Sequence, residues 1–345
     1  MSQAAPQVLC RADDVLGEGP LWDHRSSSLL WVDILRGCVH SWSEVDGVCD
    51  VLQMDALIGS IALVPLHSGL TCLPSPPRRP LSTEWRGERQ QATTAITPLS
   101  IRWRGAGGEG RPTGQSDLLL ATSKGIYRHY ALSGETRLLI HPLEGKPLRF
   151  NDGRVDALGR FWVGTMAIDP AHYSDPWGEL YRYDPDGTLH RMEEGLTISN
   201  GLDWSPDGKT FYLTDTMRRA IYAYDFNLGA GTIENRRIFV QTAEEDGYPD
   251  GLVADTTGSI WSAGFGGGAI CRYDTDGRRV ERIAMPVTCP TALTFGGEDD
   301  ATAFITSSKH VLSPDHTETE AGAVFAAQLG ARGQRSAVFG QGDLR

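Results

Sequence analysis

A short apolar strand pattern recurs six times along this chain, and the recurrence limits the possible folds more than any other feature. Successive copies begin 41, 94, 47, 50 and 41 residues apart. Each copy is followed by a turn and by a strand rich in β-branched and aromatic residues, which is the pattern of a β-hairpin. The predicted strands are 19–23, 60–64, 154–158, 201–205, 251–255 and 292–296.

A period of about 40–50 residues with several short strands per unit is typical of the blades of a β-propeller. Six copies therefore predict an all-β, six-bladed β-propeller that takes up residues 1–345 as a single domain. Helical periodicity is almost absent, which argues against an α/β hydrolase fold or a TIM barrel. Equivalent positions of different repeats are expected to meet near one axis.

One interval is about a full blade too long, and the surplus falls at residues 71–116. This segment contains seven Arg and three Glu, is rich in Pro and Gly, and lacks strand alternation. We expect a disordered insertion within blade 2, with a gene-model artefact such as retained non-coding sequence and a dedicated binding module as alternatives. Because the insertion follows an inner strand, it is expected on the face opposite the candidate site.

The composition narrows the class of protein. A net charge of -12 argues against nucleic acid or an anionic membrane as a partner, since both bind basic surfaces. No apolar run reaches the length of about 18 residues that spans a bilayer. The first residues lack the pattern of a signal peptide, and the six cysteines contain no CxxC pair. We expect a cytoplasmic protein with reduced thiols, as a monomer or weak homodimer.

Three oxygen-bearing residues stand at the start of predicted inner strands: Glu18, Asn200 and Asp250. Two carboxylates and an amide carbonyl suit a hard divalent cation such as Ca²⁺, Mg²⁺ or Mn²⁺. The competing interpretation is that Asx-Gly pairs simply form turns. A shared axis favours the metal site, because carboxylates brought together there would otherwise repel one another.

A second polar group could serve a bound substrate. Arg149 and Asn151 lead into the third inner strand and are expected to offer hydrogen-bond donors near the same axis. Asp169 follows the adjacent strand where it returns to the same face, so its carboxylate could accept hydrogen bonds from a polyol. Asp215 holds the equivalent place in blade 4, where capping of a turn is the favoured role.

Other catalytic signatures are missing from the sequence. It has no GxSxG elbow, no HExxH motif and no phosphate-binding loop of the Walker type. The glycine-rich stretch at 264–268 lies within a blade and opens no helix, so it is a poor dinucleotide motif. Four tryptophans on strand patterns are predicted to be core residues: Trp31, Trp162, Trp204 and Trp261.

Four segments carry a resemblance to a known family. LGEGPLWD, RFNDGRVDALGRFWVGTMA, ISNGLDWSPDGKTFYLTD and PDGLVADTTGSIWSAGFGGG resemble the regucalcin (senescence marker protein)/gluconolactonase family, in the family's order. The similarity covers nearly the whole chain except residues 71–116. It implies a six-bladed propeller with one axial divalent cation, which could be Ca, Zn, Mn, Mg or Fe. The implied metal ligands are Glu18, Asn200 and Asp250.

The resemblance also implies a reaction, the metal-dependent hydrolysis of a sugar lactone to an aldonic acid in carbohydrate catabolism. Asp250 would be the general base, ionised by the nearby cation, and Arg149 and Asn151 would hold the substrate. Asp169 stands where animal members carry Glu, so its contact with the sugar would be one methylene shorter. The alternatives are a non-catalytic calcium-binding regulatory propeller, a hydrolase of other esters and an interaction scaffold.

Overall fold

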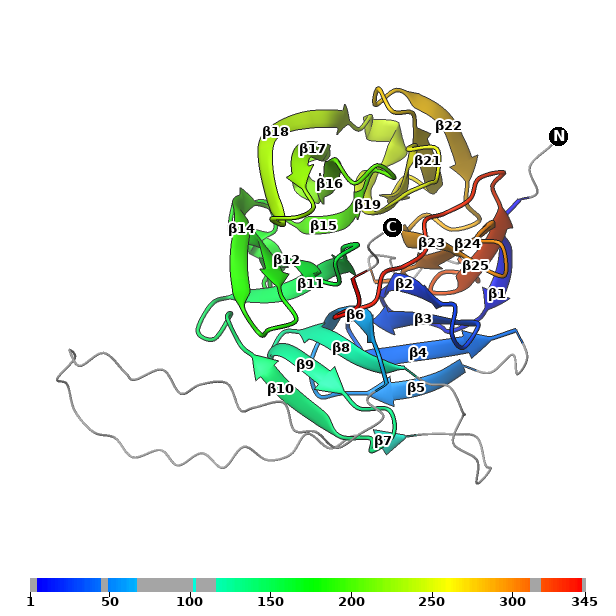
Figure 1. The fold of residues 1–345 in the computed structure, drawn as a ribbon. Coiled ribbons are helices and arrows are strands. Elements are labelled where there is room, and N and C mark those ends of the chain that lie inside the picture. The colour runs from blue at the N-terminus through cyan, green and yellow to red at the C-terminus, as the bar shows by residue number, and fades with distance from the viewer. Residues whose placement is uncertain (1–4, 45–48, 67–101, 104–115, 311–317, 343–345) are drawn as a thin grey trace.

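The computed structural model describes residues 5–44, 49–66, 102–103, 116–310 and 318–342. Six antiparallel sheets surround a common centre (Figure 1), so the predicted six-bladed β-propeller is confirmed. The innermost strand of each sheet contacts the innermost strands of both neighbouring sheets, which closes the ring. These strands are β2 (Gly17–Asp23), β6 (Ile58–Val64), β11 (Leu148–Val155), β15 (Ser199–Trp204), β19 (Tyr248–Ala254) and β23 (Pro290–Gly296).

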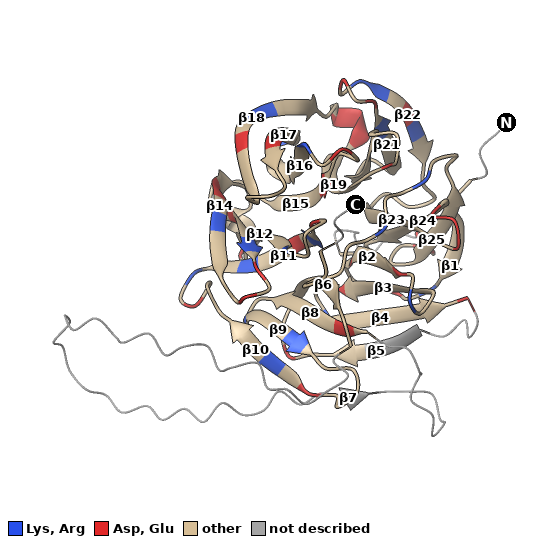
Figure 2. Ribbon diagram, viewed as in Figure 1, with Lys and Arg blue, Asp and Glu red and all other residues tan. Residues whose placement is uncertain are grey.

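Each blade continues outward from its inner strand. The second strands are β3 (Ser28–Asp33), β8 (Asp117–Thr122), β12 (Phe161–Ala167), β16 (Thr210–Asp215), β20 (Ile260–Phe265) and β24 (Thr302–Ser307). The third strands are β4 (Cys38–Ser43), β9 (Gly125–His129), β13 (Gly178–Tyr183), β17 (Ala220–Asn227), β21 (Ala269–Tyr273) and β25 (Val324–Gln328). The outer strands are β5 (Cys49–Gln53), β10 (Thr136–Ile140), β14 (Leu189–Leu196), β18 (Thr232–Gln241), β22 (Arg279–Ala284) and β1 (Gln7–Cys10). Charged residues lie along β14, β18 and β22 (Figure 2).

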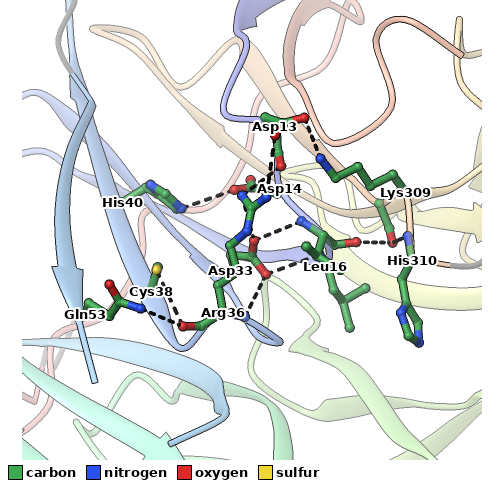
Figure 3. A network of polar contacts seen from close by, with 12 residues as sticks. Asp13, Asp14, Leu16, Asp33, Arg36, Cys38, His40, Gln53, Lys309 and His310 are labelled. Carbon is green, nitrogen blue, oxygen red and sulfur yellow. Dashed lines mark hydrogen bonds and ion pairs between the residues drawn. The ribbon is translucent and has the colours of Figure 1, made fainter. Parts of the chain in front are cut away.

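The ring is closed by strands from the two ends of the chain. β1 pairs with β25, so blade 6 contains both an N-terminal and a C-terminal strand. A polar network reinforces this junction (Figure 3), in which the carboxylate of Asp13 bonds Lys309 of blade 6 and Arg36 of blade 1. The backbone N–H of Asp14 donates to Gly322 O at 2.9 Å. Closure through hydrogen-bonded strands leaves the ring without a break between its first and last blades.

The inner strands share an irregularity at one level. In all six inner strands, the register of pairing with the second strand shifts near the N-terminal end of the inner strand, as it does at a β-bulge. Two glycines at this level face close neighbours on the next blade. A Cβ on Gly201 would lie 2.2 Å from the N of Leu252, and one on Gly251 would lie 2.4 Å from the Cβ of Ala292. Glycine is required there because the inner strands approach each other so closely.

This arrangement corrects the predicted strand boundaries. Asn200 and Asp250 lie inside β15 and β19, whereas the sequence placed them just before strands that began at Gly201 and Gly251. The third inner strand was predicted over residues 154–158 but spans Leu148–Val155. Local sequence could not reveal the bulge, since its position depends on pairing with the neighbouring strand.

The tryptophans predicted to be core residues are buried. Trp31, Trp162 and Trp261 are fully enclosed, and Trp204 is 8% exposed. A carboxylate after the inner strand holds the indole N–H in two blades. Asp156 accepts from Trp162 Nε1 at 2.8 Å, and Asp255 accepts from Trp261 Nε1 at 2.9 Å. Each pair satisfies a buried indole N–H and ties the turn to the second strand.

The C-terminal segment crosses the end of the central channel that lies away from Glu18 and Asp250. Phe339 N donates to Leu63 O at 2.8 Å, and Gln334 Nε2 donates to Trp204 O at 2.8 Å, so the segment bonds the far ends of two inner strands. The cavity left along the axis, lined by residues of all six inner strands, is only about 40 Å³.

The predicted insertion leaves and re-enters blade 2. β6 ends at Val64, which pairs with Asp117 at the start of β8. Within this stretch the structure describes a short strand, β7 (Arg102–Trp103), which pairs with β5 and extends the sheet of blade 1. Most of residues 71–116 lies outside the described residues, so the proposed disorder, and the alternatives to it, stay predictions.

Helices contribute little to the fold. The described residues contain three short 3-10 turns, none of them long and apolar enough to span a membrane. These turns are η1 (Pro170–His172), η2 (Thr216–Arg218) and η3 (Glu244–Asp246).

Candidate functional site

Three buried polar side chains from three blades face the axis. Glu18 comes from β2, Asn200 from β15 and Asp250 from β19, and each is 5–6% exposed. The Nδ2 of Asn200 donates to Asp250 Oδ1 and, at 3.2 Å, to the hydroxyl of Thr216. The Oδ1 of Asn200 is buried without a hydrogen-bond partner. A buried carbonyl of this kind is costly unless a ligand satisfies it.

The electrostatics of the cluster are unfavourable without a cation. Burial, followed by the charges of Asp250 and Asp152, raises the pKa of Glu18 well above its usual range. Burial and the charge of Asp152 likewise raise the pKa of Asp250. The carboxylates alone repel one another and favour protonation, whereas a bound cation would favour their ionised forms.

Asp152 is a member of this cluster that the sequence prediction missed. It lies in the bulge of β11, beside Asn151, and its carboxylate accepts from Gly153 N at 2.7 Å. Burial raises the pKa of Asp152 to about 6. The sequence signal for Asp152 was the Asn-Asp-Gly run of blade 3. Blades 4 and 5 have only Asn-Gly and Asp-Gly at this place, so the second Asx of blade 3 adds a carboxylate at the same level.

The donor set fits a hard divalent cation. Two carboxylates, Glu18 and Asp250, and the unpartnered carbonyl of Asn200 are oxygen donors, and a bound cation would offset the repulsion that raises both pKa values. The described residues contain no group of three or more His, Cys, Asp or Glu side chains placed to hold a metal. A site of this composition therefore depends on the amide as its third protein ligand.

Arg149 and Asn151 lie together on β11, beside the cluster. Arg149 Nη1 donates to Asn151 Oδ1 at 2.8 Å and to Phe150 O at 3.1 Å. Asn151 Nδ2 donates to Ser199 O at 3.0 Å, which ties blade 3 to blade 4. Burial lowers the pKa of Arg149, opposed by the attraction of Glu18 and Asp250. The bonds fix both side chains and leave further N–H donors of Arg149 for a ligand.

The remaining two candidates, Asp169 and Asp215, stand at the N-cap positions of 3-10 turns, and only Asp169 makes a side-chain capping bond. Asp169 is exposed, and its carboxylate accepts from Ala171 N at 2.9 Å as the N-cap of η1. Its contact with a sugar stays a prediction. Asp215 is the N-cap residue of η2 by position, but its side chain makes no capping bond, so the turn-capping role expected from sequence is not what its carboxylate does. It accepts instead from Thr197 N at 3.1 Å, in the turn before β15, and from Arg218 Nη1 at 2.8 Å.

Comparison with known proteins agrees with this architecture. Residues 16–75 and 83–309 match the family model described as "SMP-30/Gluconolactonase/LRE-like region". Regucalcin of Gallus gallus is 32% identical over 325 residues, which cover 92% of each chain.

Two solved structures share the fold. A calcium-binding protein, regucalcin, from Agrobacterium tumefaciens has a TM-score of 0.78 at 23% identity and covers 98% of this chain and 97% of its own. A gluconolactonase from Xanthomonas campestris has a TM-score of 0.64 at 24% identity and covers 93% of this chain and 88% of its own. The family match extends over most of the chain and includes every residue of the axial cluster. The chain therefore belongs to the SMP-30/gluconolactonase/LRE-like family.

Proposed function

We propose that this protein hydrolyses a sugar lactone to the corresponding aldonic acid, with one divalent cation at the axis held by Glu18, Asn200 and Asp250. The observation that carries the proposal is the buried, unpartnered Oδ1 of Asn200 beside two carboxylates of raised pKa. The family of the chain supports the choice of a lactone as substrate. We place the activity in cytoplasmic carbohydrate catabolism.

A bound cation would supply Lewis-acid polarisation of the lactone carbonyl. Asp250 takes a proton from the attacking water as the new C–O bond forms at the carbonyl carbon. It returns that proton to the ring oxygen as the ring C–O bond breaks, so the reaction consumes one water and releases a hydroxy acid. Burial and the charge of Asp152 raise the pKa of Asp250 in the absence of a cation, and a bound cation would favour the ionised form that acts as the base.

Arg149 and Asn151 position the substrate in this scheme. Their mutual hydrogen bond and the anchor of Asn151 on Ser199 O hold the donors in one orientation before a ligand arrives. Preorganised donors of this kind lower the cost of orienting the lactone ring. Asp169 is proposed to reach the sugar hydroxyls only if its cap on η1 opens.

The test is a panel of metals against lactones. Protein stripped with a chelator is assayed by proton release with glucono-, galactono-, arabino- and xylono-lactones, with Ca²⁺, Mg²⁺, Mn²⁺ or Zn²⁺ added back. We expect turnover only after metal is restored, and the same result for protein lacking residues 71–116. Turnover of simple esters but of no lactone would replace this proposal with the alternative of a general ester hydrolase.

A second candidate is a calcium-binding propeller without catalytic activity. It is favoured by the calcium-binding regucalcin of A. tumefaciens, whose fold this chain shares. Calcium binding without hydrolysis of any lactone, with any of the metals, is the outcome that supports it. The fixed Arg149–Asn151 pair favours the enzyme, because a cation alone needs no such donors.

A further inference from the structure

An arginine in an unfavourable backbone conformation lies three residues after Thr216, which contacts the axial cluster. Arg219 is the C-cap residue that follows η2 and has φ 52° and ψ 35°, the left-handed region in which glycine is usual. Its backbone is held there by Thr242 N, which donates to Arg219 O at 2.9 Å, and by Gln241 Nε2 at 3.0 Å. A residue with a Cβ is strained in this region, and strain of this kind often accompanies a functional side chain.

The side chain of Arg219 crosses from blade 4 to the site strand of blade 5. Its guanidinium carbon lies 4.0 Å from the centre of the Tyr248 ring, and Nη1 donates to Gly247 O at 2.9 Å. Tyr248 opens β19 two positions before Asp250. The other end of η2 touches the cluster, because the Thr216 hydroxyl lies 3.2 Å from Asn200 Nδ2.

The guanidinium of Arg219 keeps a charge that no described carboxylate pairs with and N–H donors that are not used by Gly247 O. Among the described residues no carboxylate forms an ion pair with it, whereas adjacent Arg218 pairs with Asp215, and Arg279 and Arg282 pair with Asp246. A guanidinium has five N–H groups, and one of those on Arg219 is used by Gly247 O. Both Arg219 and Tyr248 are partly exposed. Stacking on Tyr248 presents a flat, fixed fork, the geometry that binds an oxyanion through two hydrogen bonds.

We propose that Arg219, laid on Tyr248, is a subsite for an oxyanion carried by the lactone at the end remote from its ring carbonyl. The preferred substrates are then lactones of acidic sugars rather than neutral ones. This inference rests on the proposed lactone hydrolysis for its substrate class, but the oxyanion subsite itself does not depend on turnover. The competing role is structural, with Arg219 acting only as a clamp between blades 4 and 5.

The chain offers a matched control. Arg236 lies over the ring of Tyr222, with its guanidinium carbon 5.1 Å from the ring centre, on the outer strand of the same blade. Arg236→Gln removes a similar Arg–Tyr contact far from the axis, whereas Arg219→Gln removes the proposed subsite. Arg219→Lys keeps the charge without the planar fork and covers the case in which Arg219→Gln folds poorly.

Kinetics compare glucono-lactone, a glucaro-lactone with a free carboxylate, and 6-phosphoglucono-lactone. We expect Arg219→Gln to raise KM for the preferred acidic lactone about 10–100-fold, with kcat and the neutral lactone little changed. Comparing the carboxylate-bearing lactone with the phosphate-bearing lactone shows which of the two oxyanions the subsite prefers. Two results for Arg219→Gln would contradict the subsite: an equal effect on neutral and acidic lactones, or a lower melting temperature without any change in selectivity. Neither result would contradict the proposed lactone hydrolysis.

Binding provides the readout that does not need turnover. Calorimetry of metal-loaded protein compares glucarate with gluconate for the wild type, Arg219→Gln and Arg236→Gln. We expect the preference for glucarate to disappear only in Arg219→Gln. If no lactone is hydrolysed but this pattern appears, the subsite is supported and the proposed function fails. If wild type and Arg219→Gln show the same preference, the subsite is wrong whatever the kinetics show.

Discussion

Asn200 and Asp250, on the inner strands of neighbouring blades, share a hydrogen bond from the amide Nδ2 to the carboxylate Oδ1. The bond occupies the amide nitrogen, while the amide carbonyl is buried without a partner. Close approach of the two strands at Gly201 brings the residues together. The site is therefore assembled by blade packing rather than by one local motif.

Replacing Asp250 with Asn separates its catalytic role from its effect on stability. Asp250→Asn should lower kcat by about 10²–10⁴-fold, because the base is lost while the side-chain shape is kept. Without metal, the variant should melt no lower than the wild type, since a buried carboxylate facing Asp152 is removed. Assays and melting curves on the same preparations check both points. Wild-type kcat in this variant would assign the base to another group.

The carboxylate of Asp156 should matter for stability and not for catalysis. Asp156→Ala leaves the indole of Trp162 and the guanidinium of Arg160, 2.6 Å away, without their buried acceptor. We expect a loss of about 3–5 kcal/mol in the free energy of unfolding, measured with denaturant. The exposed turn residue Asp207 of blade 4 serves as control, and Asp207→Ala should cost under about 1 kcal/mol. Equal losses in the two variants would contradict this role.

Gly201 should be intolerant of even a methyl group. A Cβ there would meet Leu252 N at 2.2 Å and Asp250 O at 2.7 Å, so Gly201→Ala must push blades 4 and 5 apart. We expect a loss of about 1–3 kcal/mol and weaker metal binding, because Asn200 and Asp250 separate. Gly229→Ala is the matched control, since its Cβ would contact only Asn227 Oδ1 at 3.5 Å. Normal metal affinity in Gly201→Ala would show that the close approach does not build the site.

Glu179 gives blade 3 a stability that depends on pH. Burial alone would raise the pKa of Glu179. Hydrogen bonds from Lys146 at 2.7 Å, Tyr181 at 2.6 Å and Arg191 at 3.0 Å outweigh burial, so the pKa is lowered. Its contribution is complete above the ordinary pKa of 4.5 and is lost as pH falls through the lowered value.

Glu179→Gln should therefore lose about 1 kcal/mol at pH 7, with the difference from wild type vanishing in strong acid. Denaturant curves across pH measure it. The exposed residue Glu135, paired with Arg137, provides the control, and Glu135→Gln should change stability little at any pH. A difference at pH 7 that persisted unchanged in acid would rule out the ionised carboxylate as its source.

The repeat pattern was enough to predict the propeller, since alternating strands and turns are local in sequence. Glu18, Asn200 and Asp250 were predicted as a group because oxygen-bearing residues recur at the same place in different repeats, and their role as metal ligands stays a proposal. Asp152 was missed because an Asx between Asn and Gly resembles turn chemistry, and only the bulge of β11 brings it to the axis. Arg219 could not be found, because its partner Tyr248 belongs to another blade and its left-handed backbone leaves no sequence signal.

The central claim is that a single cation at the axis supports lactone hydrolysis. The most direct measurement titrates metal into chelator-stripped protein and follows bound metal and lactone turnover in the same samples, for wild type and Asn200→Leu. We predict that turnover in the wild type rises with metal occupancy and saturates at one cation per chain, while Asn200→Leu binds at least about 100-fold more weakly. Turnover in fully stripped wild type, or unchanged affinity in Asn200→Leu, would contradict the claim.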